Sequence, residues 1–370
     1  MRSPKIAIVH DWLTVSGGAE IVVEELHKLF PKAPIYTSVY NKEAVPVFAK
    51  ADVRTTYLQT RIPKKLRFKH TLWPTMRAKA FRTLDLSEFD IIISSSSAEA
   101  KAVRKNRPDQ IHISYIHTPI RYYWSHYEEF KRDFRFGPFT PFIRPVIPFL
   151  VKKMRVLDLE AIKGIDVFIA NSTVTQQRIK QYYDKASTVV YPPVYIDRWT
   201  PKLDTERSGY IIWGRHVPYK RFDLAVQAAN ALKVPLTVVG SGLDTDRLKK
   251  IAGPTITFTG RVSDAELVRL AQSAKAFLFP GEEDFGIAAV EALAAGTPVI
   301  AYAKGGALDI VQDSQSGVLF HEQTVKSMTD AMRRFETLSF SPATMHRKAK
   351  RFDRGLFITK MQKIVSDNWR

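Results

Sequence analysis

Two glutamates stand eight positions apart where a short apolar run gives way to a helical pattern. Residues 279–301, FPGEEDFGIAAVEALAAGTPVIA, place Glu283 before the expected helix and Glu291 inside it. The first amides of a helix lack intrahelical partners and favour an anion. Carboxylates accept hydrogen bonds from hydroxyl groups, so one acid could hold a sugar and the other a ribose. The alternative is a solvated Glu283 and a capping or salt-bridged Glu291, but the glycine-rich turn, helix start and spaced acids together favour a binding site.

A second set of candidates is cationic and follows another apolar run. Residues 213–223, WGRHVPYKRFD, contain Arg215 and Lys220. A nucleoside diphosphate gains negative charge as its bond to a sugar breaks, so cations aimed at it stabilise the transition state more than the ground state. Arg215 offers a forked donor and Lys220 a point charge. We expect the adjacent Arg221 to be a surface charge that points elsewhere.

These cations predict a site that needs no metal ion. The Asp-x-Asp arrangement at residues 244–246 follows Gly240-Ser241-Gly242 at an expected helix start. Aspartate is favoured there for capping and for the helix dipole alone. The chain contains no cysteine, which excludes thiolate metal sites and a cysteine nucleophile.

The first half of the chain adds further candidates, a histidine and a glycine pair, together with residues that could face a second substrate, the acceptor. His117 lies in YIHTPIR, residues 115–121, directly after an expected strand and beside a proline turn. A lone histidine is usually structural, but ligands in open α/β sheets sit beyond the carboxyl ends of strands. Gly17 and Gly18 end the segment HDWLTVSGGAE before a helix, and glycine lets backbone amides approach a phosphate. The acceptor-side candidates are Asp11, Tyr122 and Arg121, the last of which could instead form a structural ion pair.

These segments resemble the motifs of the retaining, family 4 glycosyltransferases of the GT-B fold. Glu283 and Glu291 match the family's E-x7-E motif, and Arg215 with Lys220 matches its G-R-x5-K pattern. The resemblance implies that Glu283 contacts the donor sugar, Glu291 binds the ribose, and the two cations clamp the diphosphate. It further implies that His117 contacts the transferred sugar and that the Gly17-Gly18 loop lies beside the diphosphate. Other donor-binding positions that it implies are the amides around Phe285, Gly286 and Ile287, and Arg261 with Val262 near the base.

The motif set is most similar to bacterial mannosyltransferases of exopolysaccharide and O-antigen assembly. The matching segments include SSSSAEAKAV at 94–103, YIHTPIR at 115–121 and VYPPV at 190–194. The resemblance implies GDP-mannose as donor, a lipid-linked or polysaccharide acceptor, and front-face transfer with retention of configuration. Tyr195 and Ala289 depart from residues common in this subfamily, though neither change removes a catalytic group.

Several other functions compete with this interpretation. The same fold could use a UDP-sugar, or could bind a nucleotide sugar without catalysis. A glycoside hydrolase could use the glutamate pair, but it would need no diphosphate clamp. An NAD-type site is disfavoured, because neither the Gly17-Gly18 loop nor GSGLDT at 240–245 completes G-x-G-x-x-G.

Short apolar runs alternate with helical patterns along the whole chain, which is typical of parallel sheets covered by helices. The linker-like segment at 191–201, YPPVYIDRWTP, separates two such halves. We therefore expect an α/β protein of two Rossmann-like, doubly wound domains facing an interdomain cleft. The expected bounds are 1–195 for the acceptor domain and 196–351 for the nucleotide-sugar domain, with a helix at about 352–370 packing back on the first.

The net charge is +19, and the excess lies mainly in residues 1–200, with 32 Lys and Arg against 19 Asp and Glu. The stretch at 61–82, RIPKKLRFKHTLWPTMRAKAFR, holds eight basic residues and no acid. Docking on an anionic membrane is favoured over a solvated basic face or nucleic-acid binding, since no nucleic-acid motif accompanies the charge. The start of the chain does not resemble a secretory signal, and we find no apolar stretch of membrane-spanning length. We expect a cytoplasmic protein that is peripheral at the inner face of the cell membrane.

Overall fold

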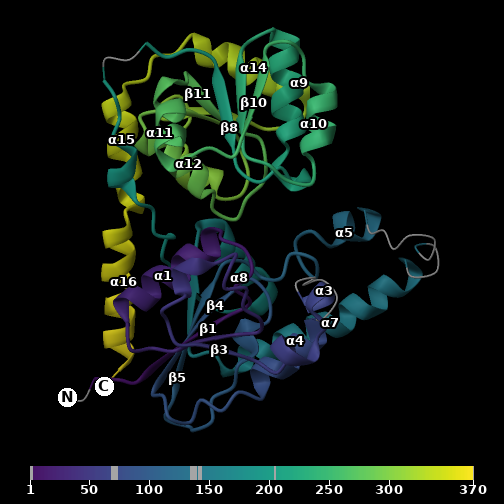
Figure 1. The fold of residues 1–370 in the computed structure, drawn as a ribbon, viewed down its shortest axis with the longest axis vertical. Helices are drawn as coiled ribbons and strands as arrows, with labels where there is room; N and C mark the ends of the chain where they lie inside the picture. The colour runs from purple at the N-terminus through teal and green to yellow at the C-terminus, as the bar shows by residue number, and fades with distance from the viewer. Residues whose placement is uncertain (1–2, 68–73, 134–139, 141–143, 204–205, 370) are drawn as a thin grey trace. The chain divides into compact units, whose positions relative to one another are not determined.

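A computed structural model of the protein describes residues 3–67, 74–133, 140, 144–203 and 206–369 (Figure 1). The chain divides into two compact units. Unit 1 comprises Met1–Tyr191 and Ile358–Arg370, and unit 2 comprises Pro192–Phe357. Each unit contains its own sheet with helices packed on it.

Unit 1 is built on a seven-stranded sheet in which neighbouring strands run parallel. Its strands, in sheet order, are β3 (Val53–Thr55), β2 (Ile35–Thr37), β1 (Ile6–His10), β4 (Ile91–Ser96), β5 (Ile111–Ile116), β6 (Val167–Ala170) and β7 (Thr188–Val189). The central strands β1 and β4 are buried along their whole length, which is why their apolar runs predict them. Strand β3 is a half-exposed edge strand, and the sequence pattern does not predict it.

The helices of unit 1 are α1 (Gly18–Leu29), α2 (Leu58–Arg61), α3 (Lys64–Arg67), α4 (Pro74–Arg82), α5 (Tyr127–Asp133), α7 (Ile147–Ala161) and α8 (Thr173–Tyr183). Helix α8 begins where the Ser172 side chain accepts a hydrogen bond from the amide of Thr175. The last helix, α16 (Arg354–Asn368), belongs to unit 1 from Ile358 onward. Residues 68–73 of the basic stretch lie outside the described residues.

Unit 2 repeats this architecture with a six-stranded parallel sheet. Its strands, in sheet order, are β10 (Ile256–Gly260), β9 (Leu236–Val239), β8 (Tyr210–Trp213), β11 (Ala276–Phe279), β12 (Val299–Tyr302) and β13 (Gly317–Phe320). Its helices are α9 (Phe222–Leu232), α10 (Thr245–Ile251), α11 (Asp264–Ser273), α12 (Ile287–Ala294), α13 (Ala307–Ile310), α14 (Val325–Glu336) and α15 (Pro342–Ala349). Helix α11 is capped by Ser263, whose hydroxyl accepts a hydrogen bond from the amide of Glu266 at 3.2 Å.

Both sheets reverse their strand order once. The reversal lies between β1 and β4 in unit 1 and between β8 and β11 in unit 2. Such a switch point leaves a crevice at the carboxyl ends of the two strands, where ligands bind in doubly wound folds. The expected fold class of two doubly wound α/β domains is confirmed, and the two switch points are the places to look for a site.

Candidate functional site

The switch point of unit 2 holds an ion pair between Lys220 and Glu283. Lys220 ends a 3-10 turn, η7 (Pro218–Lys220), that follows β8, and Glu283 lies in the loop after β11. The Lys220 Nζ lies 2.7 Å from Glu283 Oε1, and the two side chains are 16% and 19% exposed. Burial alone would lower the pKa of Lys220, but the Glu283 carboxylate outweighs it and the pKa is raised. The Lys220 ammonium therefore stays charged in a partly desolvated place.

Glycine at position 281 allows the two loops to approach this closely. A Cβ at Gly281 would lie 2.8 Å from the Cα of Lys220 and 2.9 Å from the carbonyl oxygen of Tyr219. Any side chain there would push the loop after β11 away from the η7 turn. On its other side, the Gly306 amide donates to the Glu283 carbonyl at 2.8 Å. The loop that carries Glu283 is thus held from both sides.

Glu291 lies in the second turn of α12 and is held by Trp213, the last residue of β8. The Trp213 Nε1–H donates to Glu291 Oε2 at 3.4 Å. Protein atoms surround the carboxyl although part of the residue reaches solvent, and this burial raises its pKa to about 7. Trp213 in turn stacks on Trp199, with ring centroids 5.9 Å apart and planes at 11°. The tryptophan that positions Glu291 is a site residue that the sequence motifs do not mark.

Helix α12 begins at a backbone shape that only glycine adopts easily. Gly286, its N-cap residue, has φ 103°, and a Cβ there would lie 2.6 Å from Cζ of Phe279. Phe285 is 4% exposed and packs edge-on against Phe352, with ring centroids 5.5 Å apart. Phe285 therefore anchors the loop through its side chain, and the donor contact that the sequence predicts for it is a backbone one. Ile287 is the first residue of α12 and is half-buried.

An open pocket lies at this site, and its empty space of about 200 Å³ includes the solvent at its mouth. It is lined by Trp213, Lys220 and Glu283 together with apolar residues of β8, β11 and the start of α9, namely Ile212, Phe222, Phe277, Leu278, Phe279 and Pro280. The structure thus brings together Lys220, Glu283 and, through Trp213, Glu291. A buried apolar floor with a few convergent charged groups is the usual form of a small-molecule site.

The other predicted donor-side residues of unit 2 lie more openly. Arg215 is exposed, and its side chain makes no hydrogen bond or ion pair with any described residue. Arg261 is exposed as well, and its Nε donates to Ser241 Oγ at 3.3 Å. Val262 is half-buried beside it. The Arg221 guanidinium pairs with Asp223 at 3.2 Å. This agrees with the expectation that Arg221 does not point at the donor site.

In the Asp-x-Asp segment, Asp244 forms an ion pair with a residue of the same helix turn. Asp244 is the N-cap residue of α10, but its carboxylate pairs with Arg247 instead of capping the helix. The two bonds from Arg247 are both 2.6 Å, and they lower the pKa of Asp244. Within the described ranges, no group of three or more His, Asp or Glu side chains is arranged to hold a metal ion.

In unit 1, His117 follows β5 and is 8% exposed. Its Nε2 lies 2.8 Å from the hydroxyl of Ser95 at the end of β4. Its carbonyl accepts from Thr175 Oγ1 at 3.2 Å, and its amide donates to Ser96 at 2.9 Å. These contacts fix the ring at the carboxyl end of β5, the strand next to β4 of the switch point.

Asp11 lies at the switch point of unit 1, but its carboxylate is turned into the protein. Its two oxygens accept from the amides of Ser97, Ala98 and Ala100 at 2.7 to 2.9 Å. The side chain is buried, so its contacts shape the loop after β4. This geometry supports a positioning role, and the predicted contact of Asp11 with an acceptor stays a prediction.

The Gly17-Gly18 loop starts α1, with Gly17 as N-cap residue. Two neighbouring residues that the sequence motifs do not mark lie there, His10 and Glu20. His10 Nδ1 lies 2.9 Å from the Ser95 carbonyl oxygen and Nε2 lies 3.7 Å from Glu20. Burial lowers the pKa of His10, but the Glu20 carboxylate outweighs it and the pKa is raised.

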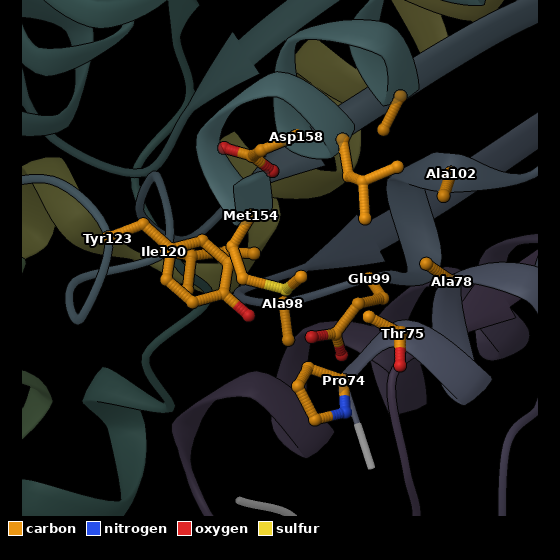
Figure 2. A pocket seen from close by; sticks show the side chains of 12 residues that line it. Pro74, Thr75, Ala78, Ala98, Glu99, Ala102, Ile120, Tyr123, Met154 and Asp158 are labelled. Atoms are coloured by element: carbon orange, nitrogen blue, oxygen red, sulfur yellow. The ribbon is translucent and has the colours of Figure 1, made fainter. Parts of the chain in front are cut away.

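Arg121 is half-buried and Tyr122 is 51% exposed, both in the loop after β5. Next to them, a second pocket of about 300 Å³ lies within unit 1 (Figure 2). Figure 2 shows Tyr123, Met154 and Glu99 around it. Glu99 is paired with Arg77 at 2.7 Å, and Asp158 with Lys101 at 2.9 Å. Each acid at this pocket therefore already has a cationic partner. The remaining lining residues are apolar or small: Pro74, Thr75, Ala78, Ala98, Ala102, Ile120, Leu157 and Ala161.

Two family models cover most of the chain. The model described as "Glycosyltransferase Family 4" matches residues 16–198, and "Glycosyl transferases group 1" matches residues 196–352. The chain therefore belongs to the family 4 glycosyltransferases of the GT-B fold, and it is related to GDP-mannose-dependent mannosyltransferases.

Among curated relatives, the chain is 28% identical over 214 residues to a D-inositol 3-phosphate glycosyltransferase of a Nocardioides species, covering 47% of each protein. It is 30% identical over 200 residues to the GDP-mannose-dependent alpha-(1-6)-phosphatidylinositol monomannoside mannosyltransferase of Mycobacterium tuberculosis, covering 46% of this chain and 52% of that protein. These matches span about half the length of the relatives.

The solved structures agree on the fold. Anabaena HepE in complex with UDP and glucose has a TM-score of 0.72 at 16% identity, with 98% of this chain and 100% of that chain covered. Sucrose-phosphate synthase from Thermosynechococcus elongatus has a TM-score of 0.73 at 16% identity, with 99% of each chain covered. At this identity the likeness carries the fold alone.

Proposed function

We propose that this protein is a retaining, metal-independent glycosyltransferase that moves a hexose from a nucleoside diphosphate to an acceptor. The observation that carries the proposal is the grouping of Lys220, Glu283 and Glu291 at the switch point of unit 2. Cations and spaced carboxylates at the carboxyl ends of two adjacent strands suit a molecule with a diphosphate and two sugars.

In this proposal the donor's diphosphate binds Lys220 and the exposed guanidinium of Arg215. The diphosphate then competes with Glu283 for the Lys220 ammonium, which leaves Glu283 to accept hydrogen bonds from sugar hydroxyls. Glu291, held by Trp213, accepts from the ribose. Backbone amides at 285–287 add donors at the start of α12.

The proposed reaction breaks the bond between the sugar's anomeric carbon and the diphosphate oxygen, and that oxygen keeps the electron pair. The acceptor hydroxyl forms the new bond to the same carbon and gives its proton to the departing oxygen. Lys220 and Arg215 stabilise the charge that grows on the diphosphate. Because the departing group serves as base, no protein carboxylate is required as a nucleophile.

We propose mannose from GDP-mannose as the transferred sugar. The motif set and the names of two mycobacterial relatives, both GDP-mannose-dependent, support this choice. A UDP-sugar donor is the second candidate, because a HepE structure of the same fold contains UDP-glucose. We propose a lipid-linked oligosaccharide or polysaccharide as acceptor, reached at an anionic membrane surface on the inner face of the cell membrane through the region at 61–82.

A thermal-shift panel of GDP, UDP, ADP and NAD tests the donor site. A ligand that binds the folded state raises the melting temperature by mass action, so GDP should give the largest rise. Glu291→Ala should reduce that rise, while Glu43→Ala, an exposed acid in unit 1, should keep it. No stabilisation by any nucleoside diphosphate would contradict the proposal. Transfer of labelled mannose from GDP-mannose to a membrane extract, with and without EDTA, then separates a transferase from a binding protein.

A further inference from the structure

Helix α7 of unit 1 exposes an unusual amount of apolar surface. Of the thirteen large hydrophobic side chains that are exposed in the described part of the chain, five lie between positions 146 and 159. Phe149 is 71% exposed and Val156 55%, followed by Val146, Leu150 and Leu159 at 47%, 46% and 37%. The sequence pattern does not reveal this, because an apolar helix that faces water has the same composition as one that faces a core.

The two faces of α7 differ in what covers them. Ile147, Val151 and Asp158 are buried against unit 1. At 3.6 residues per turn, Phe149 and Val156 are two turns apart on the opposite side, and Lys152 and Lys153 lie to either side of the line that joins them. Both lysines are exposed. We call this set, Val146, Phe149, Leu150, Val156 and Leu159 with Lys152 and Lys153, the outer face of α7.

The charge around the outer face is positive. Lys152 and Lys153 make no ion pair with any described residue, whereas Glu160 is paired with Lys163 at 2.6 Å. The neighbouring helix α4 adds Lys79, which is exposed, and Arg82, whose guanidinium donates to the Leu157 carbonyl at 3.2 Å. An apolar strip between cations matches a surface that is apolar inside and anionic at its boundary.

We propose that the outer face of α7 docks on an anionic lipid surface, with Phe149 and Val156 among the acyl chains and the two lysines at lipid phosphates. A contiguous exposed apolar patch marks an interaction site, and the cations select the partner. No described helix is long and apolar enough to cross a membrane. The row Leu150, Met154 and Leu157 leads along α7 from the outer face to the pocket of Figure 2, so the apolar surface continues inward.

A second copy of this chain is a poorer occupant. A two-fold contact through the outer face would bring the lysine pairs of both copies to the same interface. Like charges that lose water there repel one another, while lipid phosphates neutralise them. Docking through α7 can be told apart from purely electrostatic attraction by the region at 61–82. Insertion of apolar side chains persists at salt concentrations that screen charges.

Vesicle flotation of the full chain tests the proposal, with vesicles of phosphatidylcholine and of phosphatidylcholine with 30% phosphatidylglycerol (roughly the charge of an anionic leaflet). The wild type should float with the anionic vesicles. Phe149→Ser should lower the partition coefficient about tenfold, the order expected for losing a large buried apolar side chain. Leu243→Ser, at a 97% exposed leucine of unit 2, should change nothing.

The role of the two lysines is tested with a double substitution and a matched control. Lys152→Gln with Lys153→Gln should remove most of the preference for anionic vesicles, whereas the same change at the exposed Lys249 and Lys250 of α10 should preserve it. At 0.5 M salt, the wild type should still bind more than Phe149→Ser does.

Three results would overturn the docking of α7. They are no flotation of the wild type, equal flotation of Phe149→Ser and the wild type, and self-association in sedimentation velocity that Phe149→Ser abolishes while vesicles leave both proteins unbound. An unchanged circular dichroism spectrum and an unchanged melting temperature without ligand show that the Phe149→Ser protein is folded, so each of these results can be interpreted. Because the nucleotide-induced thermal shift reports on unit 2 and flotation reports on unit 1, failure of docking and failure of the proposed function are distinguishable.

Discussion

Lys220 Nζ and Glu283 Oε1 lie 2.7 Å apart, although 63 positions separate the two residues in the chain. They meet because β8 and β11 are neighbours in the sheet of unit 2, and each residue follows one of these strands. The pair lines a partly buried pocket, and a ligand anion can replace the carboxylate as the partner of Lys220. This arrangement therefore suits an anion-binding site.

The first prediction concerns this pair. Glu283→Gln should lower the rate of sugar transfer by roughly 100-fold, the size seen when one charged contact to the transition state is lost. The affinity for the nucleoside diphosphate should stay equal or rise, because Lys220 no longer has a competing carboxylate. Lys220→Gln should instead weaken nucleoside diphosphate binding. Isothermal titration with GDP and a transfer assay measure the two effects.

Lys326→Gln is the matched control, because Lys326 forms an exposed pair with Asp330 at 2.9 Å. It should change neither quantity. If Glu283→Gln and Lys220→Gln weakened GDP binding equally, the division of roles between sugar and diphosphate would be incorrect.

A second prediction follows from Glu291, whose pKa burial raises from 4.5 to about 7. Between these two values the folded protein binds more protons than the unfolded chain, so the carboxyl makes stability fall as pH rises. The loss is complete above pH 7 and amounts to at most roughly 3 kcal/mol. The melting temperature of Glu291→Gln, relative to the wild type, should therefore rise between pH 4.5 and 8.

Nucleotide binding should respond in the opposite direction. If the Glu291 carboxylate accepts hydrogen bonds from ribose, GDP affinity of the wild type should increase from pH 6 to 8, and that of Glu291→Gln should not. Glu43→Gln, at an exposed position, serves as control for both measurements. A pH profile that is the same in the wild type and in Glu291→Gln argues against the ribose contact.

The third prediction separates the hydrogen bond of Trp213 from its stacking. Trp213→Phe keeps an aromatic ring against Trp199 and Phe277 but removes the N–H that reaches Glu291. We expect nucleotide affinity to fall about fivefold, the size of one modest hydrogen bond, with the maximal rate of transfer unchanged. Trp199→Phe alters the same stack without touching Glu291 and should leave affinity near that of the wild type. Equal losses in both variants would assign the effect to stacking.

The fourth prediction concerns Asp11. Asp11→Asn replaces one charged acceptor of three backbone amides with a neutral group, and its NH₂ would face amide donors. Unfolding of unit 1 should become easier by roughly 2–4 kcal/mol. Urea titration measures this, with the exposed Asp246→Asn as control. Unchanged stability together with lost transfer would favour the acceptor role that the sequence suggests.

The alternation of apolar runs and helical patterns predicts most strands of both sheets, several of them to the residue. The sequence pattern predicts strands at 111–116, 167–170, 210–213, 236–239 and 276–279, which are the bounds of β5, β6, β8, β9 and β11, because strands buried on both faces are rich in apolar and β-branched residues. Strands β3 and β13 were not predicted. β3 is half-exposed at a sheet edge, and β13 is a short run that begins at a glycine.

The sequence also placed Lys220, Glu283 and His117 after strands, since a parallel sheet puts such positions at one edge. It did not show which of them touch. That depended on the order of strands in the sheet and on Gly281, whose missing side chain lets one loop lie against another. Long-range contacts of this kind have no local signal.

The same limit applies to Asp11 and to α7. Residue type and spacing made Asp11 a candidate for binding, but amides 86 to 89 positions away occupy its oxygens. For α7, the sequence sets the apolar side chains, whereas burial of Ile147 and exposure of Phe149 are decided by which side of the helix packs on unit 1. Sequence by itself thus determined the strands, the motif positions and the family, because these follow from local pattern. Tertiary structure alone decided the contacts and the open faces, because they depend on residues that are distant in the chain.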